Sequence, residues 1–202
     1  MLDFVTLGPQ GSNHQLVTQR YLRLHGLQGR ACIGLAEDFD EAAARVLDRR
    51  CDFLVQCAVH PATMATVARY REGLYVVDAF ISPSRDLAVI RDRRVAEPRG
   101  LALMAPTQGY VRPGRWGEVT HMPTVMAVAD GLRDGSVSRG LTYASLADEE
   151  PWRFVVDEFI GSVDDAWIVY GRERVSDGSV VAWPRSPAAA MYRRLQAAEG
   201  RR

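Results

Sequence analysis

The sequence predicts an α/β protein on three observations. Short apolar runs that suit buried strands alternate with helix-like segments along the whole chain. A glycine-rich turn joins the first strand to the first helix. The length of 202 residues accommodates one ordinary domain or two small lobes with a sizeable core. We therefore expect mostly parallel sheets covered by helices.

In the first half of the chain, apolar runs predict strands and capping residues predict helix starts. In chain order we expect a strand at 4–7, a turn at 8–11, a helix from Ser12 or Asn13 to Gly26, a helix from Asp38 to Arg50, a strand at 53–55, a helix at 60–70, and strands at 74–77 and 87–90.

A charged, irregular stretch follows at 91–99 and suits a crossing between lobes. We therefore assign residues 1–90 and 158–202 to a first lobe and residues 91–157 to a second. Beyond the stretch we expect strands at 100–104, 140–142, 154–156 and 167–170, a helix from Thr124 to Gly135, and a final helix that begins at Ser186-Pro187 and stops at Gly200.

The charge composition argues against several classes of partner and mechanism. The 25 basic and 25 acidic residues cancel. Since binding to nucleic acid or anionic membranes usually needs a basic surplus, we expect neither partner. All basic residues are arginine, which excludes mechanisms that need a lysine amine.

The cysteines and the N-terminus indicate a cytoplasmic protein. Cys32, Cys51 and Cys57 match neither a CxxC metal pair nor a disulfide framework. No segment reads as a signal peptide or approaches the ~18 apolar residues of a membrane helix. The four histidines lack ligand spacing, so we expect no metal, and we expect no cofactor.

The turn that contains Gly11, Ser12, Asn13 and His14 is the first candidate binding element. A helix N-terminus after a glycine turn offers free N–H groups to an anion, and the three polar side chains add hydrogen-bonding groups. A plain capped turn explains the same residues equally well.

Two further loops follow strands, where open α/β sheets bind ligands. Ser82, Ser84 and Arg85 offer two hydroxyls and a guanidinium that could hold a carboxylate, although a solvated loop between lobes is an equal alternative. Thr124 and Thr142 form the third candidate, and an N-cap is the simpler role for Thr124.

Two pairs carry weaker signals. Cys57 and His60 could form a thiol nucleophile with its base, but a buried, inert thiol is the stronger interpretation. Asp165, beside Asp164, could supply a proton, whereas two surface aspartates are the simpler reading. The residues alone thus indicate a two-lobed protein that binds small anions.

The segment Leu7-Gly-Pro-Gln-Gly-Ser-Asn-His-Gln15 resembles the opening motif of prephenate dehydratases. The resemblance continues to about residue 172, through 39–46, 51–55, 80–90 and 124–127. It implies a two-lobed fold like the type II periplasmic binding proteins, with the active site between the lobes. It also implies that the regulatory domain common in that family is absent.

The chain departs from this family at polar positions. The family's threonine-arginine-phenylalanine motif, thought to assist loss of the ring hydroxyl and to bind carboxylate, corresponds to Asp165-Ala166-Trp167. Its asparagine-serine segment corresponds to Val59-His60, and a serine to His14. The resemblance therefore implies a site of the same shape without the dehydration groups.

The chain is also similar to the non-aromatising prephenate decarboxylases of antibiotic pathways, which are short and likewise lack the threonine. Segments at 82–83, 87–89 and 141–142 carry this likeness. It implies a cofactor-free lyase that decarboxylates prephenate, or a related cyclic dienyl carboxylate, and keeps the ring hydroxyl. Arg85, Ser12 and the N–H groups after Gly11 would hold the carboxylates, and His14 or Asp165 would donate the proton.

Three alternatives remain open at this stage. The first is a dehydratase with rearranged groups, and the second is a lyase or isomerase for another small carboxylate. The third is a non-catalytic binding protein that senses or carries a small anion. For any of them, a homodimer through 180–183 and the final helix is a further expectation.

Overall fold

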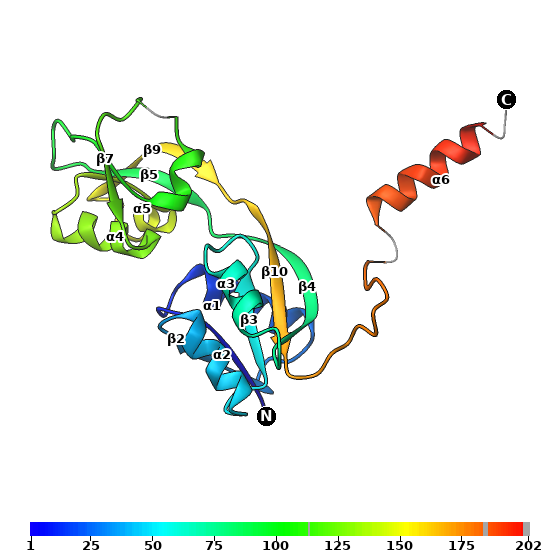
Figure 1. The fold of residues 1–202 in the computed structure, drawn as a ribbon. Helices are drawn as coiled ribbons and strands as arrows, with labels where there is room; N and C mark the ends of the chain where they lie inside the picture. Colours follow the sequence, from blue (N-terminus) through cyan, green and yellow to red (C-terminus); the bar gives the residue numbers. More distant parts are fainter. Residues whose placement is uncertain (113, 184–185, 200–202) are drawn as a thin grey trace.

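The computed structural model describes residues 1–112, 114–183 and 186–199. Two lobes are joined by two chain crossings, and α6 (Pro187–Glu199) projects away from both of them (Figure 1). The expected helix stop at Gly200 lies outside the described residues.

The first lobe contains a five-stranded sheet in the order β2-β1-β3-β10-β4. Its strands are β1 (Leu2–Leu7), β2 (Ala31–Ala36), β3 (Phe53–Cys57), β4 (Tyr75–Pro83) and β10 (Asp164–Gly171). Its helices are α1 (Asn13–Leu24), α2 (Phe39–Leu47) and α3 (Thr63–Arg69). Phe4 and Val5, adjacent on β1, are both buried and belong to cores on opposite faces. The sheet is therefore covered on both sides.

The second lobe contains another five-stranded sheet, in the order β7-β6-β8-β5-β9. Its strands are β5 (Leu87–Asp92), β6 (Leu101–Met104), β7 (Val119–Met122), β8 (Arg139–Tyr143) and β9 (Phe154–Gly161). Its helices are α4 (Val125–Asp134), α5 (Ser145–Glu149) and the 3-10 helix η1 (Ala105–Tyr110).

The strand pairing corrects the expectation of mostly parallel sheets. Four strand pairs are parallel and four are antiparallel. The antiparallel pairs all involve β5 or β10, the two strands that enter a lobe directly from the other one. Because β1, β3, β6 and β8 end toward the neighbouring lobe while β5 and β10 begin there, the entering strands run opposite to their neighbours.

The crossings between lobes differ from the expected positions. The chain passes between the sheets at 84–86 and again at 162–163. Both β5 and β9 therefore lie wholly in the second lobe, whereas the expected boundaries at 90/91 and 157/158 placed residues 87–90 and 158–161 in the first. We refer to these two crossings and the strand ends beside them as the lobe junction.

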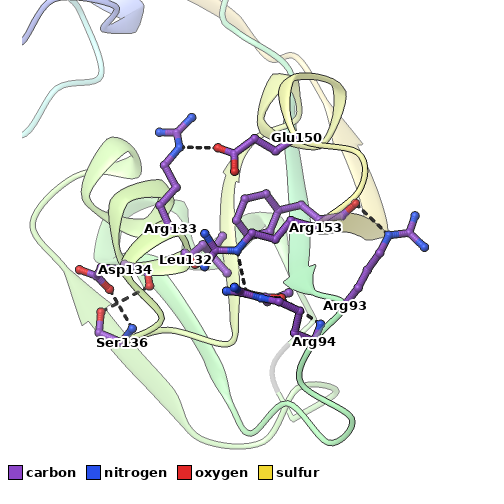
Figure 2. A network of polar contacts seen from close by, with 11 residues as sticks. Arg93, Arg94, Leu132, Arg133, Asp134, Ser136, Glu150 and Arg153 are labelled. Atoms are coloured by element: carbon purple, nitrogen blue, oxygen red, sulfur yellow. Dashed lines mark hydrogen bonds and ion pairs between the residues drawn. The ribbon is translucent and has the colours of Figure 1, made fainter.

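The charged stretch at 91–99 is not a lobe crossing, which is a second correction. Its charges belong to a polar network at the far end of the second lobe. Arg93 donates to the carbonyl of Phe154, and Arg153 donates to that of Leu132 (Figure 2). The side chain of Asp92, which is only 3% exposed, pairs with both Arg94 and Arg153.

Two strands that the patterns missed, β2 and β7, are edge strands of their sheets. Edge strands have a neighbour on only one side, so they need no long apolar run. The burial of β2 reflects this, because of its six residues only Ala36 is buried. The helix starts, in contrast, follow the capping patterns: Ser12, Asp38 and Thr124 each accept a hydrogen bond from the backbone N–H three residues later.

Replacing Gly100 by alanine is expected to destabilise the second lobe. Gly100 has a φ of +65°, and a Cβ there would lie 2.5 Å from the backbone oxygen of Glu118. Strain at positive φ and the clash together should lower the free energy of unfolding by about 2 kcal/mol, as measured by urea denaturation. Gly109→Ala, where a Cβ meets nothing within 4 Å, is the matched control. Equal stability of the two variants would contradict the geometry.

Candidate active site at the lobe junction

The lobe junction collects the ends of eight strands. β1, β3, β4, β6, β8 and β9 end there, and β5 and β10 begin there, as the pairings Asp164–Pro83 and Leu87–Tyr143 show. Gly11, in the turn after β1, lies close to the second lobe, because a Cβ on it would be 3.8 Å from Met126 of α4. Side chains from both lobes therefore meet at this junction, as open α/β folds require of a ligand site.

Hydrogen bonds link four of the predicted site residues. The Asn13 amide donates to Ser84 Oγ at 2.8 Å, and the Ser84 hydroxyl donates to Asp165 Oδ2. The Asn13 carbonyl oxygen accepts the backbone N–H of Arg85 at 3.0 Å. Asn13 thereby links the opening turn to the crossing at 84–86. Ser84 links the same crossing to β10, the strand that begins after the crossing at 162–163.

Arg85 brings positive charge to the junction. Its guanidinium lies over the ring of Tyr143, 5.3 Å from the ring centroid. Its Nε is enclosed without a hydrogen-bond partner, and no acidic side chain among the described residues pairs with it. A half-buried guanidinium without an acidic partner favours the binding of an anion that accepts its hydrogen bonds.

Two tyrosines of the second lobe contribute phenols here. Burial raises the pKa of Tyr143, while the Asn13 backbone N–H and the charge of Arg85 act in the opposite direction. Burial and the charges of Asp165 and Cys57 in the first lobe raise the pKa of Tyr110. Both phenols are therefore protonated at neutral pH and can donate hydrogen bonds.

His14 lies in an aromatic cluster beside these hydrogen-bonded residues. Its ring centroid is 5.1 Å from that of Trp167, 5.6 Å from Phe39 and 5.7 Å from His60. Burial, aided by the proximity of His60, lowers the pKa of His14 to about 3. The imidazole is neutral at pH 7, and its Nε2 is enclosed without a partner. His14 therefore offers a polar atom but no readily transferable proton.

The opening turn uses most of its own hydrogen-bonding capacity. Ser12 Oγ donates to the Leu7 carbonyl at 3.0 Å and accepts the Gln15 N–H at 3.2 Å. The Gly11 N–H donates to the Gln15 side chain at 2.6 Å. These groups hold the turn in place, so they are poorly available to a ligand.

Three other predicted residues are also internally bonded. Thr142 is fully buried and donates to the Val125 carbonyl at 2.8 Å. Thr124 caps α4, and buried Ser82 donates to the Pro83 carbonyl. Tertiary contacts thus bring Asn13, Ser84, Arg85 and Asp165 together, whereas these three hydroxyls serve the fold.

Cys57 and His60 form a buried thiol and a neighbouring imidazole rather than a nucleophile with its base. Burial and, to a smaller degree, the charge of Asp165 raise the pKa of Cys57 to about 11, so the thiol is protonated at neutral pH. His60 Nδ1 accepts the Ala62 N–H at 3.1 Å, and burial lowers the pKa of His60. Neither group is prepared for nucleophilic attack.

Neither a metal-binding cluster nor a membrane-spanning helix is found among the described residues. The described part of the chain contains no group of three or more His, Cys, Asp or Glu side chains arranged to hold a metal ion. Among those same residues, every helix is too short or too polar to cross a lipid bilayer.

Sequence reasoning missed Tyr110 as a junction residue. Tyr110 ends a short 3-10 helix, and no strand-to-turn pattern precedes it. Its proximity to Asp165 arises only when the lobes pack together, so a local pattern could not reveal it.

Comparison with known structures supports the fold. The prephenate dehydratase of Arthrobacter aurescens, in complex with L-Phe, aligns with a TM-score of 0.64 and 18% identity, covering 94% of this chain and 70% of that one. The prephenate dehydratase of Staphylococcus aureus aligns at 0.58 and 11%, covering 95% and 78%. An ABC transporter protein of Parabacteroides distasonis aligns at 0.52 and 12%, covering 85% and 66%. No family model and no curated protein matches the chain.

These similarities confirm the expected α/β class and the likeness to prephenate dehydratase and periplasmic-binding folds. The chain spans about two thirds to three quarters of the length of these structures. At 11–18% identity the likeness concerns the fold, and activity has to be argued from the junction itself.

Proposed function

We propose that this protein is a cofactor-free lyase that decarboxylates prephenate, or a related cyclic dienyl carboxylate, without loss of the ring hydroxyl. The observation that carries the proposal is Arg85. It is a half-buried cation at the lobe junction, without an acidic partner among the described residues, beside a chain of polar groups. Such a group suits a substrate that carries carboxylates.

The bond between a ring carbon and its carboxylate breaks, carbon dioxide leaves, and the electron pair passes into the ring diene. A proton from an acid then reaches a ring carbon, and the hydroxyl stays. Arg85 would hold the carboxylate that is retained, and closure of the lobes would exclude water from the carbanion-like centre.

Asp165 is the better of the two proposed proton donors. It is half-buried and accepts from Ser84, which orients it toward the junction. His14 is neutral down to about pH 3, so it has no imidazolium proton to give at neutral pH. General acid catalysis requires a group that delivers a proton to the reacting carbon, and the carboxyl group of Asp165 is the proposed donor.

The departure from dehydratases supports decarboxylation over loss of water. By the resemblance above, the threonine expected to help the hydroxyl leave corresponds to Asp165 in this chain. A site without that group, but with a free guanidinium, retains carboxylate binding and loses assistance to the leaving hydroxyl. Carbon dioxide needs no proton to leave, so decarboxylation does not require the missing group.

The first test mixes the purified protein with prephenate at neutral pH and follows ultraviolet absorbance and product mass. Loss of carbon dioxide with the hydroxyl retained is the expected result. Phenylpyruvate as the product would overturn decarboxylation in favour of dehydration. Absence of turnover would overturn the enzyme proposal for prephenate.

Replacing Arg85 by glutamine tests the carboxylate contact. Loss of a charge-assisted hydrogen bond costs roughly 1.5–3 kcal/mol, so KM for prephenate should rise roughly 10- to 150-fold. Arg30→Gln, an exposed site of the same charge change, should leave KM unaltered. Steady-state kinetics measure both, and an unchanged KM in Arg85→Gln would remove Arg85 from the site.

A non-catalytic small-anion binding protein is the second candidate. The commitment of Ser12, Thr124 and Thr142 to internal hydrogen bonds favours it, because few side chains remain for chemistry. In that case calorimetry would show prephenate binding that depends on Arg85 without any product.

A further inference from the structure

A cavity lies on the first lobe, at the end of the sheet opposite the lobe junction. It has a volume of about 260 Å³. β4 begins beside it at Tyr75 and β10 ends beside it at Tyr170 and Gly171, whereas the junction lies at Pro83 and Asp164 of the same strands. The cavity is therefore separate from the proposed active site.

A buried phenol without a partner lines this cavity. Tyr170 is 2% exposed, and its hydroxyl makes no hydrogen bond in the described structure. Burial raises the pKa of Tyr170 to about 12, so the hydroxyl is protonated and can both donate and accept. Buried polar groups are nearly always hydrogen-bonded, because leaving one unpaired costs free energy. A ligand in the cavity would remove this cost.

Positive charge lies at the rim. The Arg174 guanidinium lies 4.7 Å from the ring centroid of Tyr75 and has no acidic partner among the described residues. Arg71, also at the rim, pairs with the highly exposed Glu72, its one acidic partner within the described part of the chain. Such an exposed pair is weak in water, so both guanidinium groups are available to an anion.

The walls between these polar groups are apolar. Val67, Leu74, Val76 and Val175 line the cavity. Three of them, Val67, Val76 and Val175, are about half exposed to solvent. Covering them with an apolar ligand would gain free energy from burial. The volume lies slightly below the usual range of about 300–1,000 Å³ for ligand sites, which restricts the occupant to a small molecule.

We propose that this cavity binds a small monocarboxylate with an apolar body, as a second site beyond the proposed function. The carboxylate pairs with Arg174, the apolar body covers the valines, and a polar atom of the ligand satisfies Tyr170. Because Arg174 and Val175 lie three and four residues after the end of β10, the occupant contacts the segment that follows this strand near its start.

The test uses 3-phenylpropanoate as the probe and titration calorimetry as the measurement. The titration is done in the Arg85→Gln background, in which carboxylate binding at the junction is weakened. Saturable binding is expected, weakened roughly 10- to 150-fold by adding Arg174→Gln and about 2- to 10-fold by adding Tyr170→Phe. The neutral analogue 3-phenylpropan-1-ol should bind as weakly as the probe binds to the Arg174→Gln protein.

The controls separate this site from the junction and from general charge effects. Arg193→Gln, on α6, makes the same charge change outside the cavity and should not alter binding. No saturable binding at millimolar probe would overturn the proposal, and so would an affinity that Arg174→Gln leaves unchanged. Prephenate turnover is measured separately, so failure of either proposal is recognised without the other.

Discussion

Asp165→Asn is expected to lower kcat for prephenate decarboxylation by about 10²- to 10⁴-fold, the usual contribution of a general acid. The substitution keeps the shape of the side chain and its ability to accept from Ser84, but removes the acidic proton. KM should change little, because Arg85 supplies the carboxylate contact. Steady-state kinetics with product mass analysis measure the effect.

Asp164→Asn is the matched control for this substitution. Asp164 is the adjacent residue on β10 and is exposed, so its replacement should leave kcat within about twofold. His14→Gln should also retain most of kcat, since the histidine is neutral at the working pH. If Asp165→Asn keeps its kcat while His14→Gln loses about 10²- to 10⁴-fold, the proton donor is not Asp165.

Asp92→Ala is expected to destabilise the protein by about 3 kcal/mol, by removing the anion at the centre of the second-lobe network. Asp92 is 3% exposed, and its partner Arg153 is only 15% exposed. Truncation leaves Arg153 as a largely buried cation without its carboxylate, and breaking a buried pair in this way costs about 3–5 kcal/mol. We place the effect at the lower end because Arg94 is 63% exposed. Urea denaturation measures it.

The same carboxylate makes stability depend on pH. Hydrogen bonds from Arg94, and then from Arg153, hold the pKa of Asp92 well below its usual range. The unfolded chain therefore takes up this proton at a higher pH than the folded protein does. The contribution of Asp92 is complete at neutral pH and is lost as the pH falls below about 4, the ordinary aspartate value, toward the lowered pKa.

Two variants keep this prediction testable. Asp48→Asn breaks an exposed pair with Arg50 and should cost less than about 1 kcal/mol. If Asp92→Ala alone does not fold, adding Arg153→Met removes the unpaired cation and should recover much of the stability. A stability difference between wild type and Asp92→Ala that stays constant from pH 7 to pH 3 would contradict the linkage.

Local sequence patterns predicted the elements that depend on local physics. The strand at β1, the glycine turn and the start of α1 follow from an apolar run, backbone freedom at Gly11 and the cap at Ser12. The same patterns failed for the edge strands β2 and β7, whose burial is partial. They also misread 91–99, because a run of charges looks the same in a linker and in a paired network.

The candidate site was predictable only in part. Arg85 and Asp165 stand out because each lies beside a strand end in a polar stretch. The sequence could not show that Ser12 and Thr142 are unavailable to a ligand. A residue whose hydroxyl is free and one whose hydroxyl donates to a backbone carbonyl look the same in a sequence.

The sequence by itself determined the α/β class, the order of most elements and the presence of an arginine after β4. These features depend on periodicity, capping and residue type, which act over a few neighbouring positions. Only the tertiary structure decided that half of the strand pairs are antiparallel, and that the Ser84 hydroxyl donates a hydrogen bond to Asp165, 81 residues away. Pairing and burial are set by contacts between distant segments, and only the packed structure shows which polar groups those contacts leave free.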